Sequence, residues 1–315
     1  MRNLLTPSVM GLVAASTLVM GANATTAAQV AAEGSRTVHV TVIDKKGEPV
    51  TDLRAAEFVV KVAGKNLEVV TAETSRAPMR IALVVSDAGS GGFQGGLANF
   101  IQRLSGHAEV ALVSLVVQPE IIVDYSSDSS VLRAGLRRLG PRGLQRGAQL
   151  LETIQDATKH VRREGTRPVI VVVRVGGEAS TTLAGKHVRE QLRKSGAILY
   201  VISTVGAQRA APSQARDGIS KEQAQLRDDE AIESALNLGM VLGDGVRESG
   251  GHHLQVLSTT LIPTMDQLAD ELLNQYALTC ALPSGVKLTD KLSVSSKRKG
   301  VTVRAPSRLP NTEVR

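Results

Sequence analysis

Small polar residues and glycines follow a continuous apolar run in the first third of the chain. Residues 81–85 are apolar, and Ser86, Asp87 and Ser90 come directly after them among several glycines. Such a run is typical of a strand buried on both faces of a parallel sheet, and ligands bind where such strands end. Three chemistries are open to these residues: oxygen ligation of a divalent cation, attack by a serine nucleophile, and phosphate binding by glycine amides.

The serine of this turn lacks the surroundings that a hydrolase needs. A nucleophile elbow has glycine two residues before and two residues after the serine; Gly92 fits the second position around Ser90, but Ala88 occupies the first. His107 and His187 fall on predicted polar connections. A structural turn serine is therefore the preferred interpretation, and a secreted hydrolase that uses Ser90 is an alternative. The glycine cluster also lacks the following lysine of a P-loop and the Gly-x-Gly-x-x-Gly spacing.

Further apolar runs alternate with segments of helical periodicity. The predicted strands are residues 81–86, 108–117, 168–173, 197–202 and 252–257, and the predicted helices are residues 93–104, 148–163, 183–193, 231–248 and a segment from 263 onward. A tight return after residue 117 predicts an antiparallel edge strand at 121–123, and Asp128 is a candidate helix N-cap. The alternation predicts an α/β fold with a doubly wound, mostly parallel sheet.

Short β-branched runs stand at both ends of the chain. Residues 36–76 are expected to form an N-terminal β module, residues 78–275 the α/β domain, and residues 276–309 a set of C-terminal strands. Because chain ends often lie close together, we expect the C-terminal strands to pair with the N-terminal module in one small flanking β module. Residues 206–230 contain few large apolar side chains and are expected to be a flexible insertion or a partly helical excursion.

Several of these segments form a recognisable series. Residues 109–139 contain a strand, an edge strand, the motif Asp-x-x-Ser-Asp and a helix, and residues 248–276 contain a helix end, a strand and a second helix. Together with the turn at 86–90, they resemble the secreted bacterial VWFA-related proteins, which contain a von Willebrand factor A-like domain. The resemblance covers residues 37–309 and implies a Rossmann-like α/β fold.

The resemblance also implies a divalent-cation site built from three loops, and this chain departs from the family in each of them. Ser86 and Ala88 occupy the first two positions of the family's Asp-x-Ser-x-Ser loop, and only Ser90 is retained. Ala148 stands where the family has a threonine, and Val175 where it has an aspartate. We therefore expect a degenerate metal site, with no metal and no cofactor.

Carboxylates beside the altered loops offer an alternative. Asp87 and Glu152 are the nearest ones, so a cation-dependent adhesion module could use Asp87, Ser90 and Glu152. Arg174 is expected near the vacant site, where its positive charge would oppose a divalent ion.

Protein binding without catalysis is the function that the resemblance implies, with another protein as the partner. We call the edge of the sheet at the carboxyl ends of its parallel strands the crest. The candidate partner-binding residues of the crest are Asp87, Ser90, Arg174 and Glu178. The chain is not expected to be an enzyme.

Composition narrows the classes of partner. The 315 residues carry a net charge of +7, which suits attraction to acidic surfaces such as anionic lipid or polysaccharide. Only 2% of the residues are aromatic and none is Trp, which argues against a carbohydrate-stacking or nucleic-acid platform, and no nucleic-acid motif is present. The single cysteine, Cys280, is expected to be a small buried hydrophobe. His252 and His253 are adjacent on a strand, so they are not expected to share a zinc ion.

The first 24 residues have the pattern of a secretory signal. Arg2 precedes a short apolar stretch at 9–20, and residues 22–24 form a small-residue cleavage site. This predicts a secreted or periplasmic protein, with a retained N-terminal anchor as the alternative. No later segment is long and apolar enough to be expected to span a membrane.

Overall fold

The computed structural model describes residues 35–87, 93–115, 118–139, 148–175, 179–204, 221–282, 286–287 and 289–309. The predicted signal at 1–24 lies outside these residues, as do Ala88, Ser90 and Glu178. Among the described residues, no helix is both long and apolar enough to cross a membrane.

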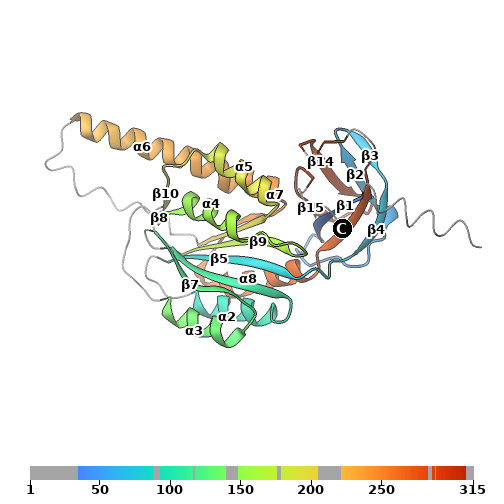
Figure 1. Ribbon diagram of the computed structural model, residues 1–315, viewed down its shortest axis with the longest axis horizontal. Helices are drawn as coiled ribbons and strands as arrows, with labels where there is room; N and C mark the ends of the chain where they lie inside the picture. The colour runs from blue at the N-terminus through green and yellow to red at the C-terminus, as the bar shows by residue number, and fades with distance from the viewer. Residues whose placement is uncertain are drawn as a thin grey trace, which may run out of the picture.

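A six-stranded sheet forms the centre of the larger part of the molecule (Figure 1). Its strands are β5 (Met79–Asp87), β6 (Ala108–Leu115), β7 (Pro119–Ser126), β9 (Arg167–Val175), β11 (Ile198–Thr204) and β12 (His253–Val256). They lie in the order β12-β11-β9-β5-β6-β7, and only the edge strand β7 runs antiparallel to its neighbour. The predicted α/β fold and its edge hairpin are confirmed.

Helices cover both faces of this sheet. On one face lie α2 (Gln94–Arg103), α3 (Ser129–Arg138) and α8 (Leu261–Leu273); on the other lie α4 (Leu150–His160), α5 (Gly185–Ser195), α6 (Lys221–Gly239), the π-helical turn η2 (Met240–Gly245) and α7 (Val246–Ser249). Alternate strand residues enter the two cores: Leu83 packs on the α2 side and Val84 on the α4 side. Because both faces are covered, each strand is apolar throughout rather than alternating.

The structure refines the expected bounds of two helices. Residues 221–230, the second part of the insertion expected at 206–230 to be flexible or partly helical, form the first half of α6. Their Glu, Gln, Ala, Leu and Arg residues favour helix, and the side chains of residues 225–230 are exposed. The helix predicted from residue 148 begins instead at Leu150, because Ala148 and Gln149 form the short strand β8 (Ala148–Gln149), which pairs with β10 (Ala179–Ser180).

The β module combines segments from both ends of the chain. Its strands are β1 (Ser35–Ile43), β2 (Phe58–Val62), β3 (Lys65–Leu67), β4 (Val69–Thr74), β13 (Tyr276–Ala281), β14 (Leu292–Ser296) and β15 (Thr302–Arg304), with the short helix η1 (Ala55–Glu57) before β2. They form two sheets, β15-β1-β13-β4 and β14-β2-β3, around one apolar core. Cys280 is buried in that core as a free thiol, and burial raises its pKa to about 11. The predicted role of Cys280 as a small buried hydrophobe is confirmed.

Arg167 and Gln275 join the sheet to the β module. Gln275 has no exposed surface, and Arg167 is 4% exposed. Arg167 Nη1 donates to Gln275 Oε1 at 2.8 Å, and Gln275 Nε2 donates to Thr41 Oγ1 at 3.1 Å and to Tyr200 Oη at 3.2 Å. The guanidinium also donates to two backbone carbonyls, those of Ala77 and Leu272. One glutamine thus links β9, β11 and β1.

His252, Arg304 and Glu271 extend this buried polar contact toward β15. Arg304 Nη1 lies 2.9 Å from His252 Nδ1 and donates to Glu271 Oε2 at 2.8 Å. The His252 ring stands edge-on to Tyr200 at 5.1 Å between centroids. Burial, with smaller contributions from Arg304 and His253, lowers the pKa of His252 to about 3. His252 is therefore neutral in the folded protein and accepts the hydrogen bond from Arg304. We call these side chains, together with Arg167 and Gln275, the polar junction.

Replacing Gln275 with Leu should destabilise the protein by about 2 to 4 kcal/mol, because Arg167 would lose an acceptor and Thr41 and Tyr200 a donor, all in the interior. Urea unfolding followed by circular dichroism measures the loss. The control is Gln102→Leu on the exposed face of α2, where the cost should stay within about 0.5 kcal/mol. Equal costs in the two variants would contradict a structural role for Gln275.

The free energy of unfolding should fall as the pH drops below 6.5. The unfolded state takes up a proton on His252 near pH 6.5, whereas the folded state resists it down to about pH 3, so acid favours unfolding. Between pH 6.5 and 5 this histidine should account for about 2 kcal/mol. In His252→Gln, which keeps an acceptor for Arg304, urea midpoints should depend less on pH. Identical pH dependence in both proteins would show that His252 does not contribute.

Candidate functional site

The carboxyl ends of β5, β9 and β11 lie side by side at the crest. In the parallel register Ser86 pairs with Arg174, and Arg174 pairs with Ser203. Residues paired in this way point to the same face of a sheet, and the preceding Val84, Val172 and Val201 belong to the core on the α4 side. Ser86, Arg174 and Ser203 therefore form a polar row on that face, each no more than 9% exposed.

Arg174 places a buried positive charge in the middle of this row. Desolvation lowers its pKa, and within the described residues no carboxylate lies within ion-pair distance of it. His253 lies nearby: its Nε2 is 3.0 Å from Ser203 Oγ, and burial and the charge of Arg174 both lower its pKa. A divalent cation brought to the same row would meet the field of Arg174 in a medium of low dielectric. The row favours an anion.

Apolar side chains occupy two of the positions where the family resemblance places metal ligands. Val175 is 5% exposed and packs in the core on the α2 side, with Val85 and Val173. Ala148 is buried in the core on the α4 side. Neither residue carries a side-chain oxygen, so the loops after β9 and before α4 supply no ligand from these two positions.

Glu152 is engaged in holding a neighbouring loop. Its Oε1 accepts hydrogen bonds from Thr181 Oγ1 at 3.0 Å, from the Thr182 backbone N–H at 2.8 Å and from Thr182 Oγ1 at 3.2 Å. Its Oε2 is buried and makes no hydrogen bond. These contacts tie the start of α4 to the segment after β10. Across the parts of the chain that the structure describes, no group of three or more His, Cys, Asp or Glu residues could hold a metal ion.

The other candidate residues of the crest lie wholly or partly outside the residues that the structure describes. Ala88, Ser90 and Glu178 are not among the described residues, and neither is the glycine- and arginine-containing loop at 140–147. Asp87 is the last residue of β5 and pairs with Val175. Of the four candidates for partner binding, the structure thus describes the side chain of Arg174.

His252 and His253 diverge, as adjacent strand residues should. His252 contacts Arg304 in the polar junction, whereas His253 contacts Ser203 near the crest. Sequence reasoning did not single out Ser203. The signal that could have identified it is the change from apolar to polar residues after Ile202, because Ser203 and Thr204 close the strand where it reaches the crest.

Replacing Arg174 with Met should leave the free energy of unfolding unchanged or raise it by up to about 2 kcal/mol. Met has a similar length and removes a buried charge that no described carboxylate compensates. The matched control is Arg167→Met, which removes an equally buried guanidinium with three acceptors and should cost about 3 to 5 kcal/mol. Chemical denaturation compares the two, and similar losses would mean that Arg174 is also a structural residue.

This protein resembles known proteins at the level of solved structures. No model of a protein family matches the chain, and no curated protein sequence matches it. Proximal thread matrix protein 1 from the mussel byssus, solved with a zinc-occupied MIDAS motif, is 14% identical over 68% of this chain, with a TM-score of 0.45. The match spans 50% of the mussel protein.

Two bacterial structures are also similar. A von Willebrand factor type A structure from Catenulispora acidiphila is 10% identical over 89% of this chain and 75% of its own, with a TM-score of 0.43. The conserved hypothetical protein BatB from Bacteroides thetaiotaomicron is 11% identical over 61% of this chain and 98% of its own, with a TM-score of 0.36. The structural neighbours of this chain are thus von Willebrand factor A-type domains at low sequence identity, and they bear on its fold alone.

Proposed function

We propose that this protein is a non-catalytic binding module whose von Willebrand factor A-like domain presents its crest to another protein without using a divalent cation. The observation that carries the proposal is the buried Arg174, which stands beside Ser86 at the strand end where the related domains would place a metal-binding carboxylate. The positive charge of a metal ion is replaced by the positive charge of a side chain.

A guanidinium in this place suits recognition of an acidic group. It is always charged, it presents planar pairs of donors to a carboxylate, and burial strengthens the interaction by lowering the local dielectric. The hydroxyls of Ser86 and Ser203 flank it and could donate further hydrogen bonds to the same group. Under this proposal Asp87, Ser90 and Glu178 complete the surface around Arg174.

We also propose that the protein works outside the cytoplasm, as a secreted or periplasmic component. The signal-like residues 1–24 support this location. The net positive charge of the chain would also draw it toward acidic partners.

Affinity capture from the envelope and secreted fractions of the source organism tests the proposal. The bait is the chain from Thr25 onward, and parallel washes contain Mg²⁺ or EDTA. We expect a stoichiometric protein partner that survives EDTA, because no step of binding needs a cation. A partner lost only in EDTA would instead support the cation-dependent module that uses Asp87, Ser90 and Glu152.

Once the partner is captured, Arg174→Met should weaken its binding at least about tenfold, the loss expected when one member of a buried charge pair is removed. The fold should persist, so the loss would report on binding. Arg133→Met on the exposed surface of α3 removes the same charge elsewhere and should leave binding unchanged. Unchanged binding by Arg174→Met would overturn the role of the crest, and labelling of Ser90 by a serine-reactive probe would favour the hydrolase.

A further inference from the structure

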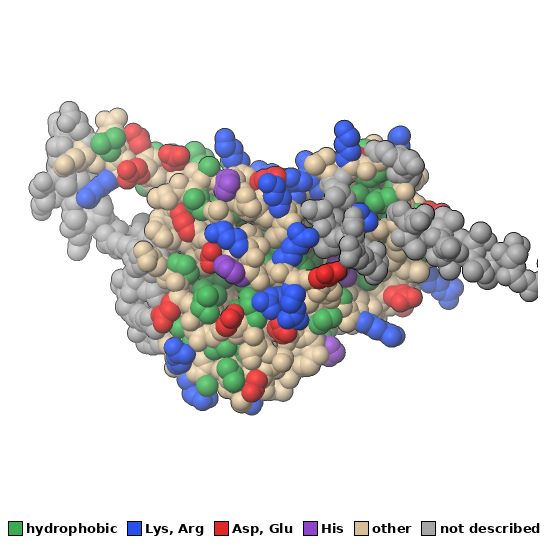
Figure 2. Space-filling model, in the orientation of Figure 1, with side chains coloured by type: hydrophobic (Ala, Val, Ile, Leu, Met, Phe, Trp, Pro, Cys, Tyr) green, Lys and Arg blue, Asp and Glu red, His purple; other side chains and the backbone are tan. Residues whose placement is uncertain are grey.

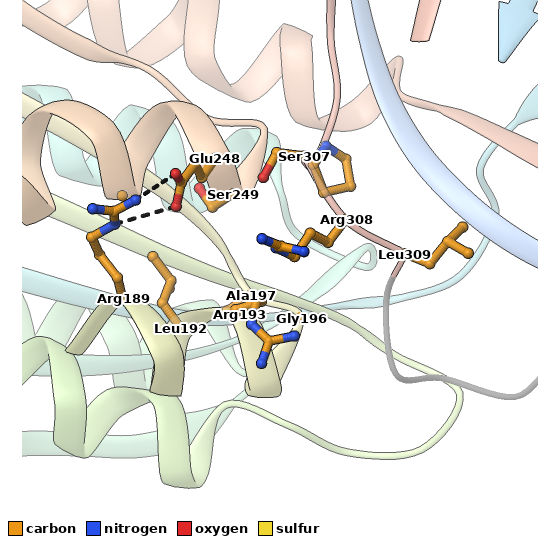
Figure 3. Close-up of a pocket in the computed structure, with 12 residues that line it drawn as sticks. Arg189, Leu192, Arg193, Gly196, Ala197, Glu248, Ser249, Ser307, Arg308 and Leu309 are labelled. Atoms are coloured by element: carbon orange, nitrogen blue, oxygen red, sulfur yellow. Dashed lines mark hydrogen bonds and ion pairs between the residues drawn. The ribbon is translucent and has the colours of Figure 1, made fainter. Parts of the chain in front are cut away.

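A cleft lies at the end of the molecule opposite to the crest, between α5, α7 and residues 305–309, which we call the C-terminal segment. Its narrow part is a cavity of about 50 Å³ whose walls include Arg193, Ala197 and Ser307 (Figure 3). A wider cavity of about 400 Å³ adjoins it and shares Glu248, Ser307 and Arg308 with it. Ala197 directly precedes β11, whereas the crest lies beyond the other end of that strand. The cleft is therefore separate from the candidate site.

Backbone contacts fix the walls of this cleft. The Ser307 N–H donates to the Glu248 carbonyl at 2.8 Å, and the Leu292 N–H donates to the Ser307 carbonyl at 2.7 Å. Gly250 ends α7 with a φ of +89°, and a Cβ there would lie only 2.8 Å from backbone atoms of residues 305 and 306. The lack of a side chain at Gly250 thus lets the C-terminal segment pass directly over the end of α7, and the hydrogen bond from Ser307 to Glu248 holds it there.

Basic side chains dominate the cleft. The five basic residues in its two parts are Arg189, Arg193, Arg247, Lys291 and Arg308, and among the described lining residues Glu248 is the one carboxylate. Figure 2 shows Lys and Arg side chains gathered over α5 and α7 beside the β module. This is a concentration of one sign of charge on a concave surface, where the electrostatic potential is focused.

Three of these five basic groups form ion pairs with described carboxylates, and the other two do not. Arg189 pairs with Glu248, Arg193 with Glu190, and Arg247 with Asp244. Lys291 and Arg308 have no carboxylate within ion-pair distance among the described residues, and both are exposed. Arg308 does interact at longer range with Glu190, whose pKa is lowered mainly by its hydrogen bond from Arg193 and, to a smaller extent, by Arg308. They lie together because residues 291 and 308 form an isolated antiparallel bridge. Figure 3 shows the Arg308 side chain extending from the C-terminal segment toward α5.

The inner end of the cleft is apolar. Leu192, Ala197, Pro306 and Leu309 line the narrow cavity, and Leu192 and Leu309 are almost fully buried. No aromatic side chain is among the lining residues. An apolar floor beneath a basic rim fits a ligand that carries both an apolar group and negative charges. A sugar chain or a nucleic acid would require stacking surfaces that this lining lacks.

We propose that this cleft binds an acidic peptide segment of a partner protein, with carboxylates on Lys291 and Arg308 and one aliphatic side chain in the narrow cavity. Arginine and lysine on the rim attract and orient the carboxylates, and the aliphatic side chain gains from leaving water. The site is independent of the crest, so the chain could hold two segments of one partner or two partners at once.

Fluorescence anisotropy with labelled synthetic peptides tests the proposal on the chain from Thr25 onward. The probe has two glutamates on each side of a single leucine, and a second probe has glycine in place of the leucine. We expect the leucine probe to bind more tightly, by about 10-fold or more, the value of one buried aliphatic side chain. Equal binding of the two probes would overturn the apolar part of the site.

Charge reversal locates the binding. Lys291→Glu with Arg308→Glu should weaken binding of the leucine probe at least about tenfold. The matched control is Lys297→Glu with Lys299→Glu, which makes the same change of net charge on exposed residues of the β module and should have little effect. Circular dichroism verifies that each variant is folded.

Absence of binding by the leucine probe would overturn the proposal. Equal weakening by both double variants would also overturn it, because it would indicate a general attraction between opposite charges. Displacement of the leucine probe by inorganic polyphosphate as effectively as by the unlabelled leucine peptide would overturn it as well, because it would indicate a site for anions in general. Arg174→Met separates this site from the crest, because it should leave the binding of the leucine probe unchanged. Loss of probe binding in that variant would mean that the peptide binds at the crest.

Discussion

Arg167 and Gln275 meet in the interior where the parallel sheet, the end of α8 and the β module come together, and the architecture depends on this contact. A buried guanidinium is tolerated only when acceptors surround it, and burial already lowers the pKa of Arg167 to about 10. Gln275 supplies one acceptor and directs its own amide to Thr41 and Tyr200. Because these partners come from β1, β9 and β11, the contact connects the β module to two strands of the sheet.

The same physical rule explains why the crest differs from the polar junction. Arg167 and Arg174 lie on the same strand and both are desolvated, yet Arg167 donates to three protein oxygens, whereas Arg174 has two serine neighbours in the strand register and no described carboxylate. A charge that the protein does not compensate is available to compensate a charge on another molecule. The contrast between the two arginines is therefore the physical basis for proposing that Arg174 binds an acidic group of a partner.

The crest and the cleft place positive charge at opposite ends of the α/β domain. At the crest the charge is buried and single, which suits one precisely placed acidic group. In the cleft Lys291 and Arg308 are exposed above an apolar floor, which suits an extended acidic segment. The polar junction ties β15 to the α/β domain through Arg304, and the backbone hydrogen bond from Ser307 to Glu248 holds the residues that follow against α7. One rigid framework thus carries both surfaces.

Local patterns in the sequence determined the doubly wound sheet and the N-cap at Asp128, whose side chain accepts from the Ser130 and Val131 N–H groups. These follow from periodicity, capping chemistry and residue type, which act over a few neighbours. Only the tertiary structure aligned Arg174 with Ser203, buried Gln275, and brought residues near 190, 248 and 308 around one cleft. Strand register, desolvation and concave shape depend on which distant segments become neighbours, and no local pattern contains that information.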